Sequence, residues 1–285
     1  MVTRMRTRWA SVLVACAALF VGGCNPSGPQ TPAVAPDSIR VATWNLRQFS
    51  DNRLADLGRI VRIINDAKFD LIAVQEIKGQ GDEVDRLLNA LGAPWRSTSL
   101  SGRTGNSERF AFLYKADRLA EVGRARFVES GRAEVFDRRP YQATFRCGQF
   151  DFTLISVHLH FSKPDQRRLE AEALAAICQE LARASSEKDI IVVGDFNEQR
   201  SRPNLDVFRA RGWETLIAEP TNLGSKEVFD NIILDRRHTR EWTGKAGVVR
   251  FDEMYFANDD KAASRDVSDH RPAWADFSTL GPDDD

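Results

Sequence analysis

The chain has 285 residues, enough after its N-terminal segment for a single core of roughly 240 residues. Its formal net charge is −1, which excludes the strong basic field typical of many nucleic-acid-binding proteins. A polyanionic ligand would therefore have to meet a local cluster of cations, for which the candidates are Arg103, Arg109, Arg138 and Arg139.

The N-terminus has the layout of a secretory signal. Three arginines within the first eight residues precede an apolar stretch from Trp9 to Gly23. This stretch is shorter than the roughly 20 residues that a membrane-spanning helix needs, so we predict a cleaved signal over residues 1–23. The residues VGGC at 21–24 resemble the lipobox of bacterial lipoproteins, and the resemblance implies that Cys24 carries lipid. Ordinary secretory cleavage near this position is the alternative.

A segment without charge follows Cys24. Asn25–Pro36 (NPSGPQTPAVAP) contains four prolines, so we predict that residues 24–37 form an extended tether. Residues 38–278 would then form one folded domain, and 279–285 an acidic, disordered tail. The resemblance to lipoproteins further implies the outer membrane if the cell is Gram-negative, because Asn25 rather than an aspartate follows the cysteine. We therefore expect a lipid-anchored, extracytoplasmic protein of the bacterial cell envelope.

Two of the four cysteines remain in the predicted domain. Export permits a disulfide between Cys147 and Cys178. Cys147 lies in a strand-like run and Cys178 in a helix-like run, so two separate buried thiols are at least as good an interpretation. Their spacing is not that of a metal-binding motif.

Apolar runs rich in Val, Ile and Phe recur along the chain and predict strands. The predicted strands are Ile39–Asn45, Leu71–Glu76, Phe110–Tyr114, Tyr141–Phe145, Phe150–His158, Ile190–Asn197, Phe229–Leu234 and Ala273–Phe277. The turn Cys147-Gly148-Gln149 predicts an antiparallel hairpin between two of these strands.

Helical spacing of apolar residues interrupts the strands three times. The three sets are Leu54, Leu57, Val61 and Ile64; Val84, Leu87, Leu88 and Leu91; and Leu174, Ile177 and Leu181. Strands outnumber helices, and a hairpin is mixed with helical crossovers. We therefore predict an α/β fold in which two packed sheets are covered by helices, rather than one open, doubly wound sheet.

Polar residues follow or interrupt the apolar runs in six places, which suggests strand ends that converge on one charged site. They are Asn45, Glu76, His158, Asp195 with Asn197, Asp230, and Asp269 with His270. Carboxylates, amides and histidines, without a glycine-rich nucleotide loop or a catalytic-serine motif, suit a metal-assisted attack on phosphate. Among the histidines, His160 and His238 have no such context, so we expect a structural role for His160 and a loop position for His238.

The clearest single motif is Gly194–Asn197 (GDFN). Two residues apart on a strand end, Asp195 and Asn197 are predicted to point to the same side, where an acid could take a proton from water and an amide could hold a phosphoryl oxygen. Gly194 would allow a close approach of backbone or ligand. The alternative is a strand that runs into an Asx-type turn. Glu76 follows five apolar residues, so a cation or an arginine is its expected partner, and an edge-strand glutamate facing solvent is the alternative.

The chain contains, in this order, the short motifs TWN, QE, VHL, GDFN, FDNI and SDH. They resemble the motifs of the endonuclease/exonuclease/phosphatase superfamily, and the resemblance covers about residues 39–277. The resemblance implies a four-layer α/β sandwich with two central, mainly antiparallel sheets. Within the superfamily the chain is most similar to the deoxyribonuclease I-like branch. Ser107–Tyr114 (SERFAFLY) resembles the stretch that carries the catalytic glutamate of that branch, here Glu108, and Phe136–Pro140 (FDRRP) resembles the segment with its phosphate-contacting arginine, here Arg138.

The resemblance also implies roles for the other residues. Glu108 with His158, and Asp230 with His270, would form two acid–imidazole pairs on opposite sides of the scissile phosphorus. Asp195 would orient or deprotonate the attacking water, and Asn197 would contact the phosphate. A metal ion, Mg²⁺ with Mn²⁺ or Ca²⁺ as alternatives, would be held by the remaining residues Asn45, Glu76 and Asp269.

The sequence departs from the deoxyribonuclease I-like pattern in two respects. Asn106 stands where that branch places an aromatic residue against the minor groove, and the paired cysteines of that branch have no counterpart. Our prediction is a monomeric, metal-dependent phosphodiesterase, most simply a non-specific endonuclease that acts on DNA. The alternatives are a phosphomonoesterase or phospholipase-type diesterase acting on lipid or sugar phosphates, and a surface protein that uses the fold only for binding.

Overall fold

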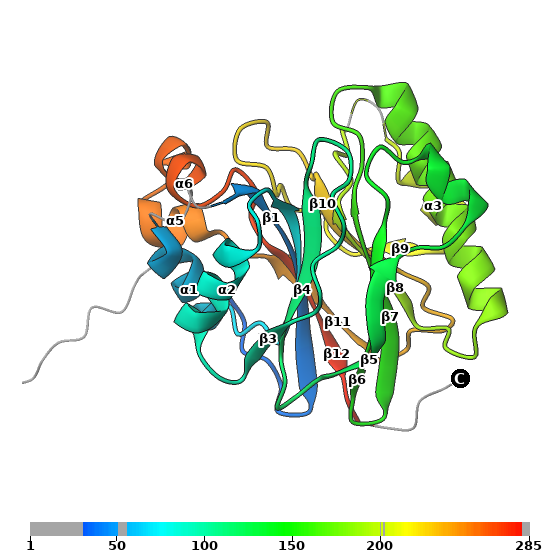
Figure 1. The fold of residues 1–285 in the computed structure, drawn as a ribbon, viewed down its shortest axis with the longest axis horizontal. Coiled ribbons are helices and arrows are strands. Elements are labelled where there is room, and N and C mark those ends of the chain that lie inside the picture. The colour runs from blue at the N-terminus through cyan, green and yellow to red at the C-terminus, as the bar shows by residue number, and fades with distance from the viewer. Residues whose placement is uncertain (1–30, 51–55, 200, 202, 281–285) are drawn as a thin grey trace, which may run out of the picture.

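The computed structural model describes residues 31–50, 56–199, 201 and 203–280. Two six-stranded sheets pack face to face in the centre, and helices cover the outer face of each sheet (Figure 1). The predicted four-layer α/β sandwich is confirmed.

The first sheet has the strand order β11-β12-β1-β2-β4-β3. In chain order its strands are β1 (Ser38–Phe49), β2 (Leu71–Ile77), β3 (Trp95–Ser97), β4 (Arg109–Lys115), β11 (Trp242–Val248) and β12 (Ala273–Ser278). The helices on this side are α1 (Leu57–Asp66), α2 (Asp82–Leu91), α5 (Phe251–Phe256) and α6 (Asp260–Asp266). Only β1 and β2 are parallel neighbours, and α1 is the crossover between them.

The second sheet has the order β5-β6-β7-β8-β10-β9. Its strands are β5 (Ala120–Phe127), β6 (Tyr141–Cys147), β7 (Phe150–His158), β8 (Ile190–Asp195), β9 (Glu214–Thr215) and β10 (Asp230–Leu234). It is accompanied by the long helix α3 (Pro164–Ala184), the short helix α4 (Asp206–Arg209) and the 3₁₀ helix η2 (Gly131–Val135). Again one pair, β7 and β8, is parallel and is joined through a helix, α3.

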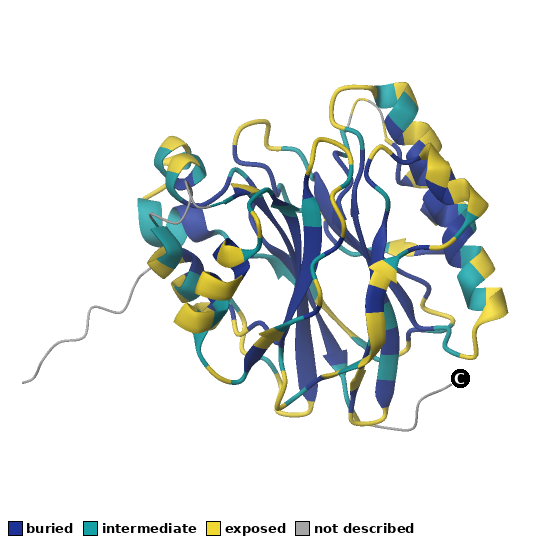
Figure 2. Ribbon diagram, in the orientation of Figure 1, coloured by how far each residue is buried: buried dark blue, intermediate teal, exposed yellow. Residues whose placement is uncertain are grey.

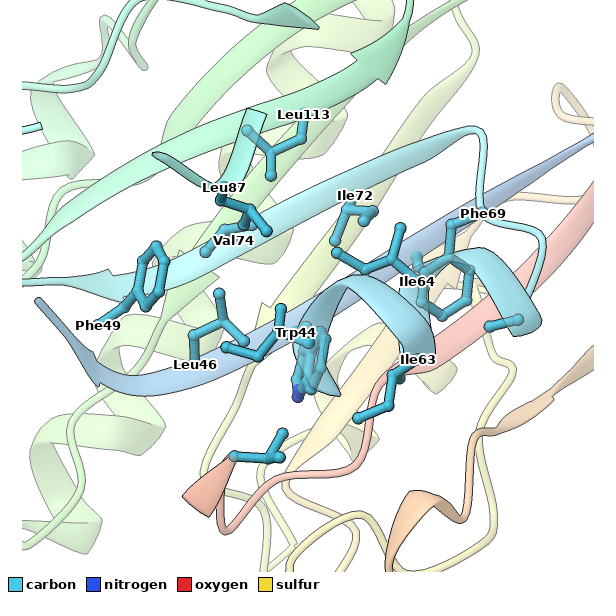
Figure 3. Close-up of a cluster of buried hydrophobic side chains, with 14 of the residues drawn as sticks. Trp44, Leu46, Phe49, Ile63, Ile64, Phe69, Ile72, Val74, Leu87 and Leu113 are labelled. Carbon is cyan, nitrogen blue, oxygen red and sulfur yellow. The ribbon is translucent and has the colours of Figure 1, made fainter. Parts of the chain in front are cut away.

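Strand alternation sorts the apolar residues into three cores. In β1, Ile39 and Val41 face the second sheet, while Ala42 and Trp44 face the helices. Figure 3 shows the core between the first sheet and its helices, where Trp44 lies beside residues of α1. A second core fills the space between the sheets and a third lies under α3. Figure 2 shows the result, with buried strands in the centre and exposed residues on the outer helix faces.

All eight predicted strands are present, but four further strands were not predicted: β3, β5, β9 and β11. All four lie at sheet edges, and β5 and β11 contain many exposed or half-buried residues, so their sequences lack a continuous apolar run. The predicted helices are α1, α2 and α3, although Leu54 lies outside the described residues. The predicted hairpin is the β6–β7 connection, in which Cys147 pairs with Phe150.

Cys147 and Cys178 are both buried and free, so the interpretation as two separate thiols is confirmed. The predicted signal, Cys24 and most of the predicted tether lie outside the described residues, as does most of the acidic tail. Residues 31–37 contain neither helix nor strand. Among the residues that the structure describes, no helix is long and apolar enough to cross a membrane.

Candidate active site

The predicted polar residues meet at one end of the space between the two sheets. They continue the rows of side chains that face this space: Val41 leads to Asn45 in β1, Val193 to Asp195 in β8, and Ile232 to Asp230 in β10. The same alternation places Glu108 and His158 on this side, before β4 and at the end of β7. Most of the site residues are buried, namely Asn45, Glu108, Arg138, His158, Asp195, Asn197, Asp230 and His270.

Glu108 and His158 form the first acid–imidazole pair, with 2.7 Å between Glu108 Oε2 and His158 Nδ1. The other oxygen of Glu108 accepts a hydrogen bond from Arg138 Nε. Burial disfavours the charged carboxylate, but the His158 and Arg138 charges outweigh it and lower the pKa of Glu108 to about 2. Burial likewise disfavours charged His158, yet the carboxylates of Asp195 and Glu108 raise its pKa. The structure therefore brings together the predicted pair of Glu108 and His158, and it adds Arg138, which the resemblance had named only as a phosphate-contacting residue.

Asp230 and His270 form the second pair, also with 2.7 Å between Asp230 Oδ2 and His270 Nδ1. Burial opposes protonation of His270, but the nearby Asp230 and Asp195 carboxylates raise its pKa to about 10. Ser268 Oγ accepts a hydrogen bond from the His270 backbone and donates one to the Asn45 carbonyl oxygen. The loop that carries His270 is thereby tied to the end of β1.

Asp195 lies between the two pairs. Its Oδ2 is 3.4 Å from His158 Nε2 and 3.8 Å from His270 Nε2, and it accepts a hydrogen bond of 3.0 Å from Asn45 Nδ2. Burial raises the pKa of Asp195, against the opposing effect of the two imidazoles. Gly194 is necessary here, because a Cβ at this position would lie 2.1 Å from the Val157 carbonyl oxygen. The predicted close approach at Gly194 is thus a contact with the neighbouring strand.

The predicted strand geometry of Asn197 is wrong. Strand β8 ends at Asp195, and Asn197 has a positive φ of 49°. Its backbone N–H donates to Asp195 Oδ1 at 2.8 Å, and its side-chain Nδ2 donates to the Leu159 carbonyl oxygen at 3.0 Å. This is the Asx-type turn considered as the alternative. The turn uses one oxygen of Asp195 and leaves Oδ2 facing Asn45 and the imidazoles.

A β-bulge directs Glu76 toward the site. Val74 pairs with Ala111 but Ile77 pairs with Arg109, so β2 has one extra residue in this stretch. Regular alternation would send Glu76 toward the helices. Instead Glu76 has a φ of 61°, and its Oε1 accepts a hydrogen bond from Asn45 Nδ2 at 3.0 Å. The Gln48 backbone N–H donates to the other carboxylate oxygen at 2.8 Å. Among the described residues its hydrogen-bond partners are therefore amide groups and not an arginine, which was one of the two expected partners; the other was a cation.

Two groups of side chains have oxygen and nitrogen atoms close enough to hold a cation, Glu76 with Glu108 and His158, and Asp195 with Asp230 and His270. Within each group the ligand atoms lie within 4.8 Å of one another. Carboxylate and amide oxygens are ligands that Mg²⁺ prefers, so the donor set around Glu76 and Asn45 fits a hard divalent ion.

Asp269, the third predicted metal ligand, forms an ion pair with an arginine. Its half-buried carboxylate forms an ion pair with Arg47, with 3.7 Å between Nε and Oδ2. Arg47 also donates through Nη1 to Ser264 at 2.7 Å from the carbonyl oxygen. The structure thus joins Asn45 to Glu76 by a hydrogen bond and pairs Asp269 with Arg47.

Three of the four arginines considered as a polyanion-binding cluster have structural partners. Arg103 donates to the carbonyl oxygens of Gly79 and Ser107, and Arg109 donates to that of Gln80. These hydrogen bonds tie the loop after β2 to the loop before β4, which also contains Asn106. Arg139 packs over the Phe127 ring. Only Arg138 of the four takes part in the acid–imidazole pairs.

The sequence did not predict the side chain that holds the segments next to Arg138 and His158. Glu170 of α3 is buried, and its carboxylate accepts hydrogen bonds from the backbone N–H groups of Asp137 at 3.0 Å and His160 at 2.7 Å. It therefore holds the segments next to Arg138 and His158. A glutamate on the apolar face of a predicted helix was the available signal. His160 has a local role, since its Nδ1 accepts a hydrogen bond from the Lys163 backbone, and His238 lies in the β10–β11 connection.

Comparison with known proteins agrees with this arrangement. The sequence matches the model of the Endonuclease/Exonuclease/phosphatase family over residues 42–270, which includes every site residue described above. It is 30% identical over 275 residues to a deoxyribonuclease of Thioalkalivibrio sp. (strain K90mix), with 86% of this chain and 73% of the relative covered. It is 24% identical to the human endonuclease/exonuclease/phosphatase family domain-containing protein 1, covering 85% of this chain but about half (49%) of that relative. A mannosyl-6-phosphatase of Bacteroides thetaiotaomicron has a similar fold, with a TM-score of 0.57, 16% identity, and 83% and 98% of the two chains covered.

Proposed function

Because the chain belongs to the endonuclease/exonuclease/phosphatase family, we propose that it is a divalent-metal-dependent phosphodiesterase that hydrolyses DNA without sequence specificity. The observation that carries this proposal is the convergence of two acid–imidazole pairs on Asp195 Oδ2, at 3.4 and 3.8 Å. A phosphodiester has an attacking and a leaving oxygen on opposite sides of phosphorus. Two imidazoles that both approach one carboxylate oxygen offer one group to each of these sides.

The residues divide the reaction between them. Asp195 Oδ2 orients the attacking water and takes its proton, while one of the imidazoles, held by its carboxylate, gives a proton to the leaving oxygen. Arg138 Nη1 is buried and makes no hydrogen bond within the described chain, although Asp137 Oδ2 lies 3.4 Å away. This group is free to donate to a non-bridging phosphate oxygen. The Asn197 amide, which donates one N–H to the Leu159 carbonyl oxygen, would give its second N–H to the same phosphate.

A divalent cation, Mg²⁺ in our proposal, would be held by Glu76 and Asn45. When bound, it polarises the phosphoryl group and stabilises the negative charge that develops on it. Asp269 pairs with Arg47 through Oδ2, so its other oxygen would join these ligands. Asn45 would present its carbonyl oxygen rather than the amide group that now faces Glu76 and Asp195.

DNA is the proposed substrate because the relative with 30% identity is a deoxyribonuclease. The fold alone does not select a substrate, since the fold neighbour with 16% identity acts as a mannosyl-6-phosphatase. Hydrolysis of a lipid or sugar phosphate is therefore the competing outcome of the test.

The test uses supercoiled plasmid DNA and the full chain with Mg²⁺, with and without EDTA. The matched variants are His158→Ala and His238→Ala. His238 is the control because it lies in the β10–β11 connection, where its backbone bonds to Asp235 and Arg240 rather than to a site residue. We expect EDTA-sensitive nicking by the wild type and by His238→Ala, and none by His158→Ala. Intact plasmid with Mg²⁺, Mn²⁺ and Ca²⁺ alike would contradict the DNA assignment. Release of inorganic phosphate from a sugar phosphate would then identify a phosphomonoesterase.

We further propose that the protein is a monomer anchored to the cell envelope by lipid on Cys24. The support is the arginine-rich, apolar N-terminus that ends in VGGC at 21–24. Partition of the expressed protein into a detergent phase, and its loss in Cys24→Ser, would support the anchor. Equal partition of both proteins into the aqueous phase would contradict it.

A further inference from the structure

A polar bridge crosses the otherwise apolar space between the sheets, directly behind the candidate site. Gln75 Nε2 in β2 donates to Ser156 Oγ in β7 at 2.9 Å and to Thr43 Oγ1 in β1 at 3.1 Å. The same amide group is 3.1 Å from the Ala73 carbonyl oxygen. Gln75, Thr43 and Ser156 are all fully buried.

The surroundings make this bridge sensitive to how the sheets are aligned. The other side chains of this layer are mainly hydrophobic, among them Val41, Leu71 and Leu154. Burying an amide or a hydroxyl in such a layer is unfavourable unless it is hydrogen-bonded. The three groups satisfy one another only when β7 faces β1 and β2 in this register, so a slip of one sheet over the other would leave them unpaired.

Each of the three residues of the bridge lies one or two residues along the chain from a residue of the site. Thr43 is two residues before Asn45 on the same face of β1, and Ser156 is two residues before His158 on the same face of β7. Gln75 is followed directly by Glu76 within the bulge. An inward-facing Gln75 and a Glu76 that reaches Asn45 can coexist only because of that bulge.

We propose that Gln75 is a positioning residue, which anchors the bulge that presents Glu76 and keeps the two sheets in the register that the acid–imidazole pairs require. Both pairs cross between the sheets, because Glu108 precedes β4 and His158 ends β7, while Asp230 begins β10 and the His270 segment leads into β12. This inference rests on the proposed function, in which these residues form one hydrolytic site.

The test must separate positioning from general stability. Gln75→Met alone would leave Thr43 and Ser156 without partners and destabilise the fold. The triple variant Thr43→Val, Gln75→Met, Ser156→Ala removes all three polar groups together, which is close to neutral for stability when the shapes are similar. The matched control is Thr144→Val with Thr153→Val, because Thr144 Oγ1 and Thr153 Oγ1 form a 2.9 Å hydrogen bond within the second sheet rather than between sheets.

For each full-length protein we would measure kcat and KM for plasmid or bis(p-nitrophenyl) phosphate, the Mg²⁺ affinity by calorimetry without substrate, and the melting temperature. We expect the triple variant to melt near the wild type but to lose about tenfold or more in kcat with little change in KM. Its Mg²⁺ affinity should fall about tenfold, as is typical when the support of a metal ligand is lost. The control variant should keep the wild-type kcat and the wild-type Mg²⁺ affinity.

A folded triple variant with wild-type kcat and wild-type Mg²⁺ affinity would overturn the proposal. Should the triple variant fail to fold, the single variant Ser156→Ala tests the proposal in the same assays. We expect a severalfold loss of kcat, and an unchanged kcat would contradict the proposal. If the wild type hydrolyses no phosphate ester, the proposed function fails, and the calorimetric comparison alone then decides whether Gln75 supports Glu76.

Discussion

The two acid–imidazole pairs have the same carboxylate–imidazole distance, 2.7 Å, but different surroundings. Glu108 divides its oxygens between His158 and Arg138, so a second cation competes for its charge. Asp230 gives Oδ2 to His270, and its buried Oδ1 has no hydrogen-bond partner within the described chain. Only the first pair therefore includes a guanidinium that could turn to a substrate phosphate. The two pairs therefore have the same carboxylate–imidazole distance but differ in the groups that surround the carboxylate.

Loss of Asp195, which lies next to both imidazoles, should have the largest effect on turnover. Asp195→Ala removes the acceptor between both imidazoles and the proposed base, so we expect kcat to fall by about 10³, within the range for general acid–base catalysis. Steady-state kinetics on plasmid or oligonucleotide DNA measures this. A loss smaller than that in either histidine variant would show that the pairs act independently of Asp195.

Loss of one imidazole should have the next largest effect. His158→Ala and His270→Ala should each lower turnover by at least ~10², because each removes one proton-transferring or charge-stabilising group. The same assay, with the double variant added, shows whether the losses add. Near-normal turnover in both single variants would contradict the site assignment.

The guanidinium distinguishes the first pair from the second. Arg138→Lys keeps the charge but loses the planar fork, so we expect about a tenfold fall in kcat/KM. Glu108 keeps its hydrogen bond to His158, which should preserve the fold. The check is kinetics together with a melting curve. An unchanged kcat/KM would mean that Arg138 serves only to hold Glu108.

Loss of the Thr221 hydroxyl, which supports the backbone of Asp230, should have the smallest effect on turnover. Thr221 Oγ1 accepts a hydrogen bond of 2.9 Å from the Asp230 backbone N–H. Thr221→Val leaves that buried donor without a partner, so the free energy of unfolding should fall by about 1–3 kcal/mol, with turnover reduced only a fewfold. Urea denaturation and kinetics measure the two effects. A loss of turnover as large as that of His270→Ala would show that Thr221 does more than support the strand.

Much of the fold could be predicted from the sequence, because central strands of two packed sheets are apolar runs. β7 and β8 are examples. β5 and β11 could not, since an edge strand has one unpaired side and tolerates exposed polar residues and glycine. The residue types of the site were predictable because buried carboxylates and imidazoles at strand ends are unusual.

Details that depend on the path of the backbone were not predictable. Period-two alternation would direct Glu76 toward the helices and Asn197 to the side of Asp195, yet a bulge redirects the first and a turn the second. The partner of Asp269 depends on Arg47, a residue with a positive φ of 46° beyond the predicted strand. No local sequence pattern indicated that Gln75 would reach across to the other sheet.

The central claim is that the two imidazoles act on opposite sides of phosphorus, and a substrate with sulfur in place of the bridging leaving oxygen tests it most directly. Sulfur leaves without needing a proton, so a variant that lacks only the proton donor should recover on this substrate. The account predicts that one of His158→Ala and His270→Ala regains at least about tenfold relative to the ordinary oligonucleotide, while the other stays impaired. Recovery of neither variant, or of both equally, would contradict it.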